Sequence, residues 1–196
     1  IEGWHLFEEA VQAGVTIEKI FALESYRNQL AAFPQTVWVS EEILRDLADT
    51  QTPQGIVAVI QKEEVGPPDF SQGKFLFLED VQDPGNVGTM IRTADAAGLT
   101  GVIVSDKSAD IYSLKTLRSM QGSHFHLPIY RMPSQTLLEE AKEAGIPVLA
   151  TTLSKDSKDY RDLPYLDQFV LVMGNEGQGI SSVMAESADQ LVHTCL

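Results

Sequence analysis

Long apolar runs, cysteine pairs and a signal sequence are all absent from this sequence. No run of about 18 apolar residues occurs, which excludes a transmembrane helix, so no membrane partner is expected. The segment Ile1–Phe7 has no basic stretch followed by an apolar one, and we expect no signal peptide. Cys195 is the single cysteine, which excludes an internal disulfide. A reducing, cytoplasmic location is therefore expected.

Metal-binding residues are also sparse. The chain has four scattered histidines, and a zinc site is not expected. His124 and His126 alternate as neighbours on a strand would, and together they could hold a metal. Two partly buried or solvated histidines explain the same pattern more simply, so we expect no metal.

Basic residues are few. The chain has 14 Lys and Arg against 28 Asp and Glu, which gives a net charge of −14. This balance argues against a nucleic-acid partner, because phosphate contacts need Lys and Arg. The distribution of charge matters more than its total, since a local basic patch can act on an acidic protein. The acidic pairs Glu41-Glu42, Glu63-Glu64 and Glu139-Glu140 fall in expected surface or linker segments.

Hydrophobic residues make up 43% of the chain, which is enough for a packed core. Residues 1–62 are predicted to form a small α/β domain, with Ser40 as the N-cap of a helix. Its strands are expected at Ile17–Leu23, Val37–Val39 and Ile56–Ile60. Residues 63–73 are polar and rich in Gly and Pro, which is typical of a linker.

From Lys74 onwards, strand patterns and helix patterns alternate. Strands are predicted at Phe75–Leu78, Gly101–Ser105, Leu127–Tyr130, Pro147–Thr151 and Phe169–Met173, and helices at Val87–Ala97, Ser113–Met120, Ser134–Ala144 and Ser181–Ser187. This alternation predicts an α/β domain over residues 74–196, with a mostly parallel sheet covered on both faces.

The segment Leu78–Asp95 is the most informative in the chain. Its Asp-Pro-Gly-Asn sequence at positions 83–86 predicts a tight turn between a strand and a helix. Asn86 either caps that helix, or touches a substrate or aligns Arg92. Arg92 shares a helix face with Asp95. Its simplest interpretation is a solvated arginine paired with that acid.

A glycine loop follows the last predicted strand, at Gly174–Gly179. The order G-x-x-G-x-G is not the dinucleotide fingerprint, and no Gly-Lys-Ser or Gly-Lys-Thr of a phosphate-binding loop occurs. Glycines here let the backbone approach a flat ligand. Glu176 either acts as an acid at this site or accepts nearby backbone N–H groups. Lys115 and Arg118 share a helix face, and are either contacts for phosphate groups or part of a solvated surface.

These segments resemble the first and second motifs of the SpoU (TrmH-like) family of RNA 2′-O-ribose methyltransferases. The resemblance implies a SPOUT fold, in which a parallel sheet ends in a C-terminal trefoil knot. Residues 1–62 resemble the L30e-like RNA-binding domain that precedes many such domains, through Gly3, His5–Ala10 and Thr52–Val59. The implied activity is methyl transfer from S-adenosylmethionine to a ribose 2′-hydroxyl, on rRNA first and tRNA second. A homodimer is also implied.

The resemblance assigns catalytic roles to Arg92, Asn86 and Glu176. An arginine binds a neighbouring phosphate through two hydrogen bonds. Because a free guanidinium stays protonated, we favour positioning over base catalysis for Arg92. The residues implied to bind the cofactor are Thr151, Thr152, Leu153, Gly174, Asn175, Gly177, Gly179 and Ile180.

The family also has a third motif, a Ser-Leu-Asn segment followed by a helix of small residues. The sequence stops at Leu191–Leu196, where this motif should begin. We therefore expect weak or no cofactor binding by a chain that ends there, and an incomplete knot. One alternative is a non-catalytic RNA-binding protein derived from the same family. Another is a different nucleotide-binding enzyme of doubly wound fold, which the glycine order disfavours.

Overall fold

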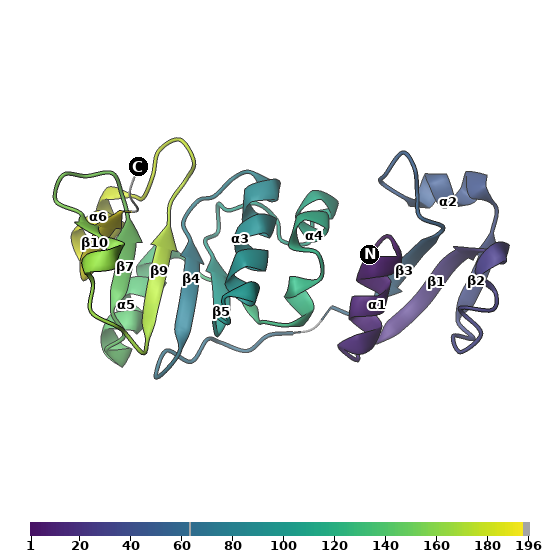
Figure 1. The fold of residues 1–196 in the computed structure, drawn as a ribbon, viewed down its shortest axis with the longest axis horizontal. Helices are drawn as coiled ribbons and strands as arrows, with labels where there is room; N and C mark the ends of the chain where they lie inside the picture. Colours follow the sequence, from purple (N-terminus) through teal and green to yellow (C-terminus); the bar gives the residue numbers. More distant parts are fainter. Residues whose placement is uncertain (63, 194–196) are drawn as a thin grey trace. The chain divides into compact units, whose positions relative to one another are not determined.

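The computed structural model describes residues 1–62 and 64–193, so Glu63 and residues 194–196, Cys195 among them, lie outside the described residues. The chain divides into two compact units, Ile1–Glu64 and Val65–Leu196 (Figure 1). The domain boundaries expected from the sequence, 1–62 and 74–196 with a linker at 63–73, remain a prediction.

Unit 1 is a three-stranded sheet with two helices. Its elements are α1 (Trp4–Gln12), β1 (Ile17–Leu23), the 3-10 turn η1 (Glu24–Tyr26), β2 (Thr36–Val39), α2 (Glu41–Leu47) and β3 (Ile56–Ile60). The strand order is β2-β1-β3, with β1 parallel to β2 and antiparallel to β3. Ser40 caps α2 as predicted, because its hydroxyl accepts a hydrogen bond of 3.3 Å from the Ile43 amide. Phe7 of α1 packs on Ile20 and Ile56 in the core of this unit.

Unit 2 is built around a seven-stranded parallel sheet. Its elements are β4 (Lys74–Leu78), α3 (Pro84–Ala96), β5 (Gly101–Val104), α4 (Leu114–Met120), η2 (Ser123–Phe125), β6 (Ile129–Arg131), α5 (Ser134–Ala144), β7 (Val148–Thr151), β8 (Lys158–Asp159), η3 (Tyr160–Asp162), β9 (Phe169–Met173), α6 (Ser182–Ser187) and β10 (Gln190–His193). The strand order is β6-β5-β4-β9-β7-β10-β8, and every described pairing is parallel. This confirms the predicted α/β class with a parallel sheet.

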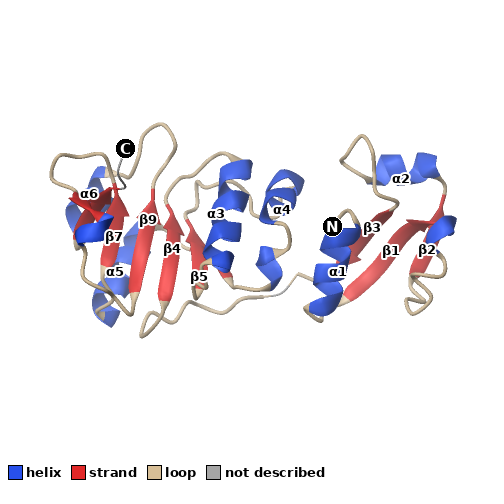
Figure 2. Cartoon of the chain, viewed as in Figure 1, coloured by secondary structure: helices blue, strands red, loops and turns tan. Residues whose placement is uncertain are grey.

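Two cores cover the two faces of this sheet. Successive side chains of a strand point to opposite faces, so Phe75 and Phe77 of β4 enter one core while Leu76 and Leu78 enter the other. Helices α5 and α6 cover the first core, and α3 and α4 cover the second. The helices (blue in Figure 2) therefore lie on both sides of the strands (red).

Several predicted boundaries were wrong. Helix α3 begins at Pro84 instead of Val87, because Asp83 caps it and proline suits the first helical position. The Asp83 side chain accepts from the amides of Gly85, at 2.7 Å, and Asn86, at 3.1 Å. Asn86 is thus inside the helix and is not its cap. His124 lies in η2 and not on a strand. Strands β8 and β10 were not predicted, and the knot stays a prediction.

Candidate active site

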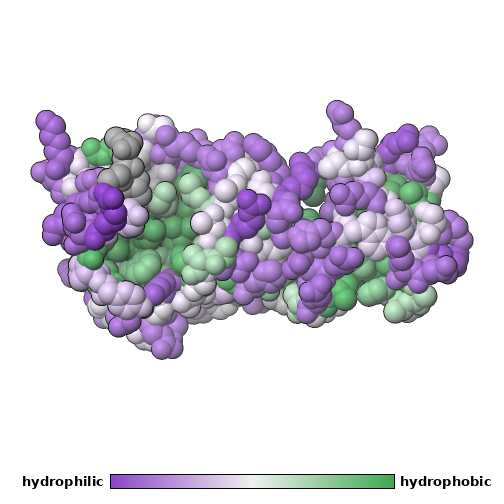
Figure 3. Space-filling model, in the orientation of Figure 1, coloured by the Kyte–Doolittle hydropathy of each residue, from purple (hydrophilic) through white to green (hydrophobic). Residues whose placement is uncertain are grey.

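A wide pocket lies against the part of the sheet that α3 and α4 leave uncovered. Its volume is about 940 Å³. The floor comes from alternate residues of three adjacent strands: Leu149 of β7, Leu171 and Met173 of β9, and Val192 of β10. On β7 and β9, the neighbouring residues along each strand face the opposite core. Figure 3 shows the resulting apolar surface over β7 and β9 in green.

The pocket opens at the carboxyl ends of β7 and β9, where ligands of parallel α/β sheets gather. Thr151, Thr152 and Leu153 form one wall. The Thr151 hydroxyl donates to the Val172 carbonyl at 2.9 Å, which fixes this wall to β9. Leu153 is 79% exposed, so an apolar side chain stands uncovered at the rim.

The glycine loop 174–179 forms a second wall and closes on itself. Asn175 and Gly179 exchange two backbone hydrogen bonds, of 3.0 and 2.9 Å. A Cβ added to Gly174 would lie 2.3 Å from the carbonyl carbon of Gly179, so closure of the loop requires this glycine. Gly179 has a φ of +71°, which also favours glycine. An added Cβ would meet only Asn175 Oδ1, at 3.7 Å, at Gly177 and nothing within 4 Å at Gly179. Close approach of a ligand to these glycines remains a prediction.

Glu176 connects this loop to the turn that precedes α3. Its carboxylate accepts from the backbone amides of Gln82, at 3.3 Å, and Asp83, at 3.2 Å, and from the Asn86 side-chain amide at 3.1 Å. The two segments are also joined by the Asn175 side-chain amide, which donates to the Asp80 carbonyl at 2.8 Å. The structure therefore brings the predicted residues Asn86 and Glu176 together.

The pKa of Glu176 reflects this bonding. Partial burial acts to raise the pKa, but the hydrogen bonds from backbone amides and from Asn86 outweigh it and hold the pKa below its usual value. Glu176 is therefore an ionised acceptor at neutral pH. The geometry agrees with the interpretation that Glu176 accepts backbone N–H groups. The donors, however, lie mainly in the turn before α3 and not in the glycine loop.

Arg92 lies on α3 with an exposed side chain, two turns beyond Asn86. Within the described part of the chain, Arg92 forms no hydrogen bond or ion pair. The alternative in which Arg92 pairs with Asp95 is not what the described residues show, because that carboxylate contacts Nδ1 of His126 at 2.9 Å. The guanidinium is thus available for an external group.

The two predicted phosphate contacts lie on α4. The Lys115 ammonium is 3.0 Å from the Asp83 carboxylate, and this contact is the main cause that lowers the Asp83 pKa. Lys115 therefore supports the cap of α3. Arg118 is half-buried on the same helix. Neither residue lines the pocket.

Most of the predicted cofactor residues do line the pocket. These are Thr151, Thr152, Leu153, Gly174, Asn175, Gly177 and Gly179, together with the predicted catalytic residue Glu176. Ile180 instead packs against the core under α5 and α6. The apolar floor was missed, because Leu149, Leu171 and Met173 read as ordinary buried strand residues. Glu79, a buried acid directly after β4, was missed as well, although an acid ending an apolar strand is an available signal.

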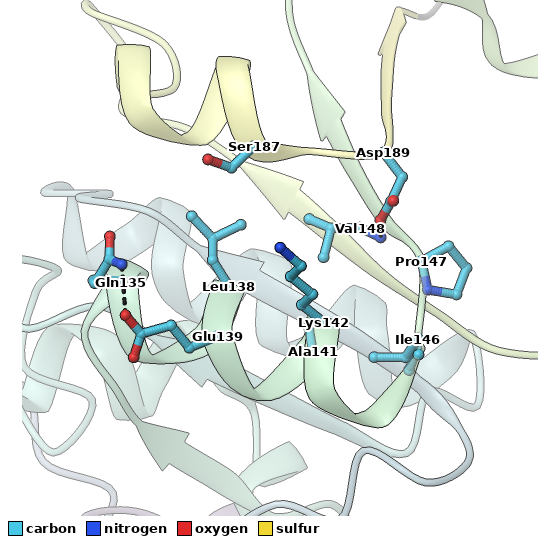
Figure 4. Close-up of a pocket in the computed structure, with 11 residues that line it drawn as sticks. Gln135, Leu138, Glu139, Ala141, Lys142, Ile146, Pro147, Val148, Ser187 and Asp189 are labelled. Carbon is cyan, nitrogen blue, oxygen red and sulfur yellow. Dashed lines mark hydrogen bonds between the residues drawn. The ribbon is translucent and has the colours of Figure 1, made fainter.

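A second cavity, of about 520 Å³, lies between α5 and the chain around α6. Figure 4 shows Lys142 between Leu138 and Val148, with Ser187 and Asp189 on the far side. This cavity is at the amino end of β7, next to Pro147. It therefore lies at the amino ends of the strands, whereas ligands of parallel α/β sheets bind at the carboxyl ends.

The described residues contain no group of three or more His, Cys, Asp or Glu placed to hold a metal. Burial lowers the pKa of His124 to about 4, which keeps this ring neutral. Among the described helices, none is both long and apolar enough to cross a membrane.

Known proteins resemble this chain in sequence and in structure. The 23S rRNA (guanosine(2553)-2′-O)-methyltransferase RlmP of Bacillus subtilis is 40% identical over 191 residues, which cover 96% of this chain and 76% of that protein. An AdoMet-bound rRNA methyltransferase from Sinorhizobium meliloti superposes with a TM-score of 0.87 at 32% identity, covering 100% of this chain and 77% of that one. For the SpoU methyltransferase AviRb from Streptomyces viridochromogenes in complex with AdoMet, the TM-score is 0.81 at 27% identity, with coverages of 100% and 80%.

Family profiles match both units of the chain. Residues 1–58 match the MRM3-like substrate binding domain. Residues 73–195, which include the pocket and both loops around Glu176, match the SpoU rRNA Methylase family. The second match spans most of the sequence, and the chain therefore belongs to the SpoU rRNA methylase family.

Proposed function

We propose that this protein transfers a methyl group from S-adenosylmethionine to a ribose 2′-hydroxyl of ribosomal RNA, with transfer RNA as the second candidate. The observation that carries the proposal is the connection between the pocket and α3. Glu176 of the glycine loop holds the turn that begins α3, and α3 carries Arg92. These bonds therefore hold the glycine loop that lines the pocket and Arg92 in a fixed position relative to each other.

The pocket fits this cofactor by its chemistry. The floor of Leu149, Leu171 and Met173 suits a flat adenine ring, and the loop 174–179 offers backbone polar groups at the rim. A volume of about 940 Å³ is large enough for a nucleoside with an amino-acid tail. S-adenosylmethionine supplies a methyl group activated by its sulfonium, so the protein has mainly to position the acceptor.

Arg92 is proposed to hold the acceptor. Its planar guanidinium binds a phosphate through two hydrogen bonds and stays protonated, so it can orient the ribose and stabilise charge that develops on the 2′ oxygen. Asn86 and Glu176 act on Arg92 indirectly, by fixing the first turn of α3. They are proposed as positioning residues, and Arg92 as the catalytic residue.

The remaining RNA contacts are proposed for α4 and unit 1. Arg118 and Lys115 are the two phosphate candidates on α4. Lys115 shares its ammonium with Asp83, so a phosphate would have to compete with that carboxylate. Unit 1 is proposed to bind the RNA substrate, supported by its match to a substrate-binding domain. A homodimer is also proposed.

The test is methylation of purified rRNA and tRNA with S-adenosylmethionine that carries a labelled methyl group. We expect label in rRNA, in nucleosides whose mass gain stays with the sugar after the base is released. A 2′-O-methyl group should also protect the adjacent phosphodiester from alkali. Label on a base would contradict the ribose assignment. RNA binding without transfer would favour the non-catalytic alternative.

A further inference from the structure

Glu79 is a buried acid for which the proposed reaction has no use. It follows Leu78, the last residue of β4, and its side chain is in the interior, with the residue only 3% exposed. A buried carboxylate is costly unless hydrogen-bond donors surround it. Its donors therefore indicate what the residue is there to hold.

Both ends of the glycine loop bond to Glu79. The backbone amide of Glu79 donates to the carbonyl of Met173, the last residue of β9, at 2.8 Å. The carboxylate accepts from the amide and from the hydroxyl of Ser181, each at 2.8 Å. Met173 precedes the loop and Ser181 follows it, so Glu79 is bonded to the residues on both sides of the loop.

Two further contacts make this span rigid. The Ser181 hydroxyl accepts from the Met184 amide at 3.1 Å, so the same group caps α6. The neighbour of Glu79, Asp80, has a left-handed φ of 57° and offers its carbonyl to Asn175 in the loop. Met173 before the loop, Asn175 near its start and Ser181 after it are thus each bonded to Glu79 or to Asp80.

We propose that Glu79 is a positioning residue that holds the glycine loop in the shape that binds S-adenosylmethionine. The inference rests on the proposed function for the identity of the ligand. Glu79 itself does not line the pocket and acts through Ser181.

The test is Glu79→Gln in the full-length protein. The oxygen of the amide can still accept from the Ser181 amide, but its NH2 group faces the Ser181 hydroxyl, which must then accept where it donated and loses its bond to a charged group. Calorimetry should show binding of S-adenosylmethionine weakened about tenfold, since hydrogen bonds to charged groups are strong. Glu186→Gln is the matched control, because it removes the same charge from the exposed surface of α6 and should bind as wild type does.

A second readout needs no ligand. Hydrogen exchange at the Ser181 amide should become at least tenfold faster in Glu79→Gln, whereas amides of β5 should stay protected. Ser181→Ala should weaken ligand binding in the same direction, and the double variant should lose less than the sum of the two single changes. If Glu79→Gln does not fold, the affinity of Ser181→Ala for S-adenosylmethionine tests the proposal by itself.

The outcomes separate the two proposals. Wild-type protein that fails to bind S-adenosylmethionine would overturn the proposed function. Wild-type protein that binds it, with Glu79→Gln and Ser181→Ala both folded and equally tight, would overturn the role of Glu79.

Discussion

Glu176 and Asn86 are 90 residues apart in the chain, yet one hydrogen bond joins them. From the sequence, Glu176 could be either an acid that takes part in the reaction or an acceptor of backbone N–H groups. A carboxylate that already accepts three hydrogen bonds, and whose pKa is lowered, is a weak base. Its contribution is therefore better described as geometry than as proton transfer.

Glu176→Gln should lower the methylation rate and change the pH dependence of stability. A lowered folded-state pKa stabilises the fold fully above the usual glutamate pKa, and this contribution is lost as pH falls through the lowered value. The variant should therefore lose less stability on acidification than the wild type. Denaturant unfolding from pH 7 down to about pH 3 measures this. Parallel curves for the two proteins would rule out the role of the ionised carboxylate.

Arg92→Ala should abolish transfer, since no other group replaces the guanidinium. The exposed side chain has no described partner, so melting temperature and cofactor affinity should stay within error of the wild type. Arg92→Lys should also fail, because an ammonium lacks the planar fork. A fall of several degrees in melting temperature would instead indicate a structural role.

At the scale of elements, α3 and α4 pack unusually closely. A Cβ added to Gly88 would lie 2.5 Å from Cβ of Ser119 and 2.7 Å from the Thr116 carbonyl oxygen. The glycine thus permits the backbones to approach, and this approach brings Lys115 to Asp83. The turn at the start of α3 is consequently supported from α4 as well as from the glycine loop.

Gly88→Ala should destabilise the protein by about 1–3 kcal/mol, because overpacking forces the two helices apart. Chemical denaturation gives the value. Ala97→Gly, at the exposed end of the same helix, is a suitable control for the change in backbone freedom. Equal stability of Gly88→Ala and the wild type would show that the helices separate freely.

The basic residues of α4 lead to a prediction about how RNA affinity depends on salt concentration. Removing one phosphate contact should reduce the slope of log affinity against log salt by about one. We expect this for Arg118→Ala and for Lys115→Met alike. Lys142→Met, on α5, is the control. An unchanged slope in both Arg118→Ala and Lys115→Met would contradict a role of α4 in binding phosphate.

The sequence predicted elements where one local signal dominates. Strand β9 and helix α5 have the predicted bounds, since an apolar run and a helical period mark them clearly. The start of α3 was missed because Asp83 and Asn86 are both good caps, and only the fold shows which one is used. The pocket floor could not be predicted, since Leu171 has the pattern of a core residue. Whether a helix covers that face is a property of the whole sheet.

At the scale of the molecule, each unit has its own core. The core around Phe7 and Ile20 belongs to unit 1, whereas both cores of the parallel sheet belong to unit 2. Every residue that lines the pocket lies in unit 2 as well. Cofactor binding and RNA selection are therefore expected to be separable.

Protein lacking residues 1–64 should keep the S-adenosylmethionine affinity of the whole protein while its affinity for RNA falls. Calorimetry measures the first quantity and filter binding at fixed salt measures the second. Circular dichroism would verify that the shortened protein is folded. Loss of cofactor affinity in a folded sample would show that unit 1 completes the pocket.

The strand order of unit 2 has a consequence for biosynthesis. Strand β4 pairs with β5 soon after it in the chain, but its other neighbour, β9, is synthesised about a hundred residues later. The segment from β4 to β6, with α3 and α4, can therefore assemble on the ribosome while one edge of β4 is still bare. The floor residues Leu171 and Met173, and the partner of Asn86, are synthesised only with β9 and the loop after it. The helix that carries Arg92 can thus form early, and the pocket is completed only after β9 and the loop behind it have been synthesised.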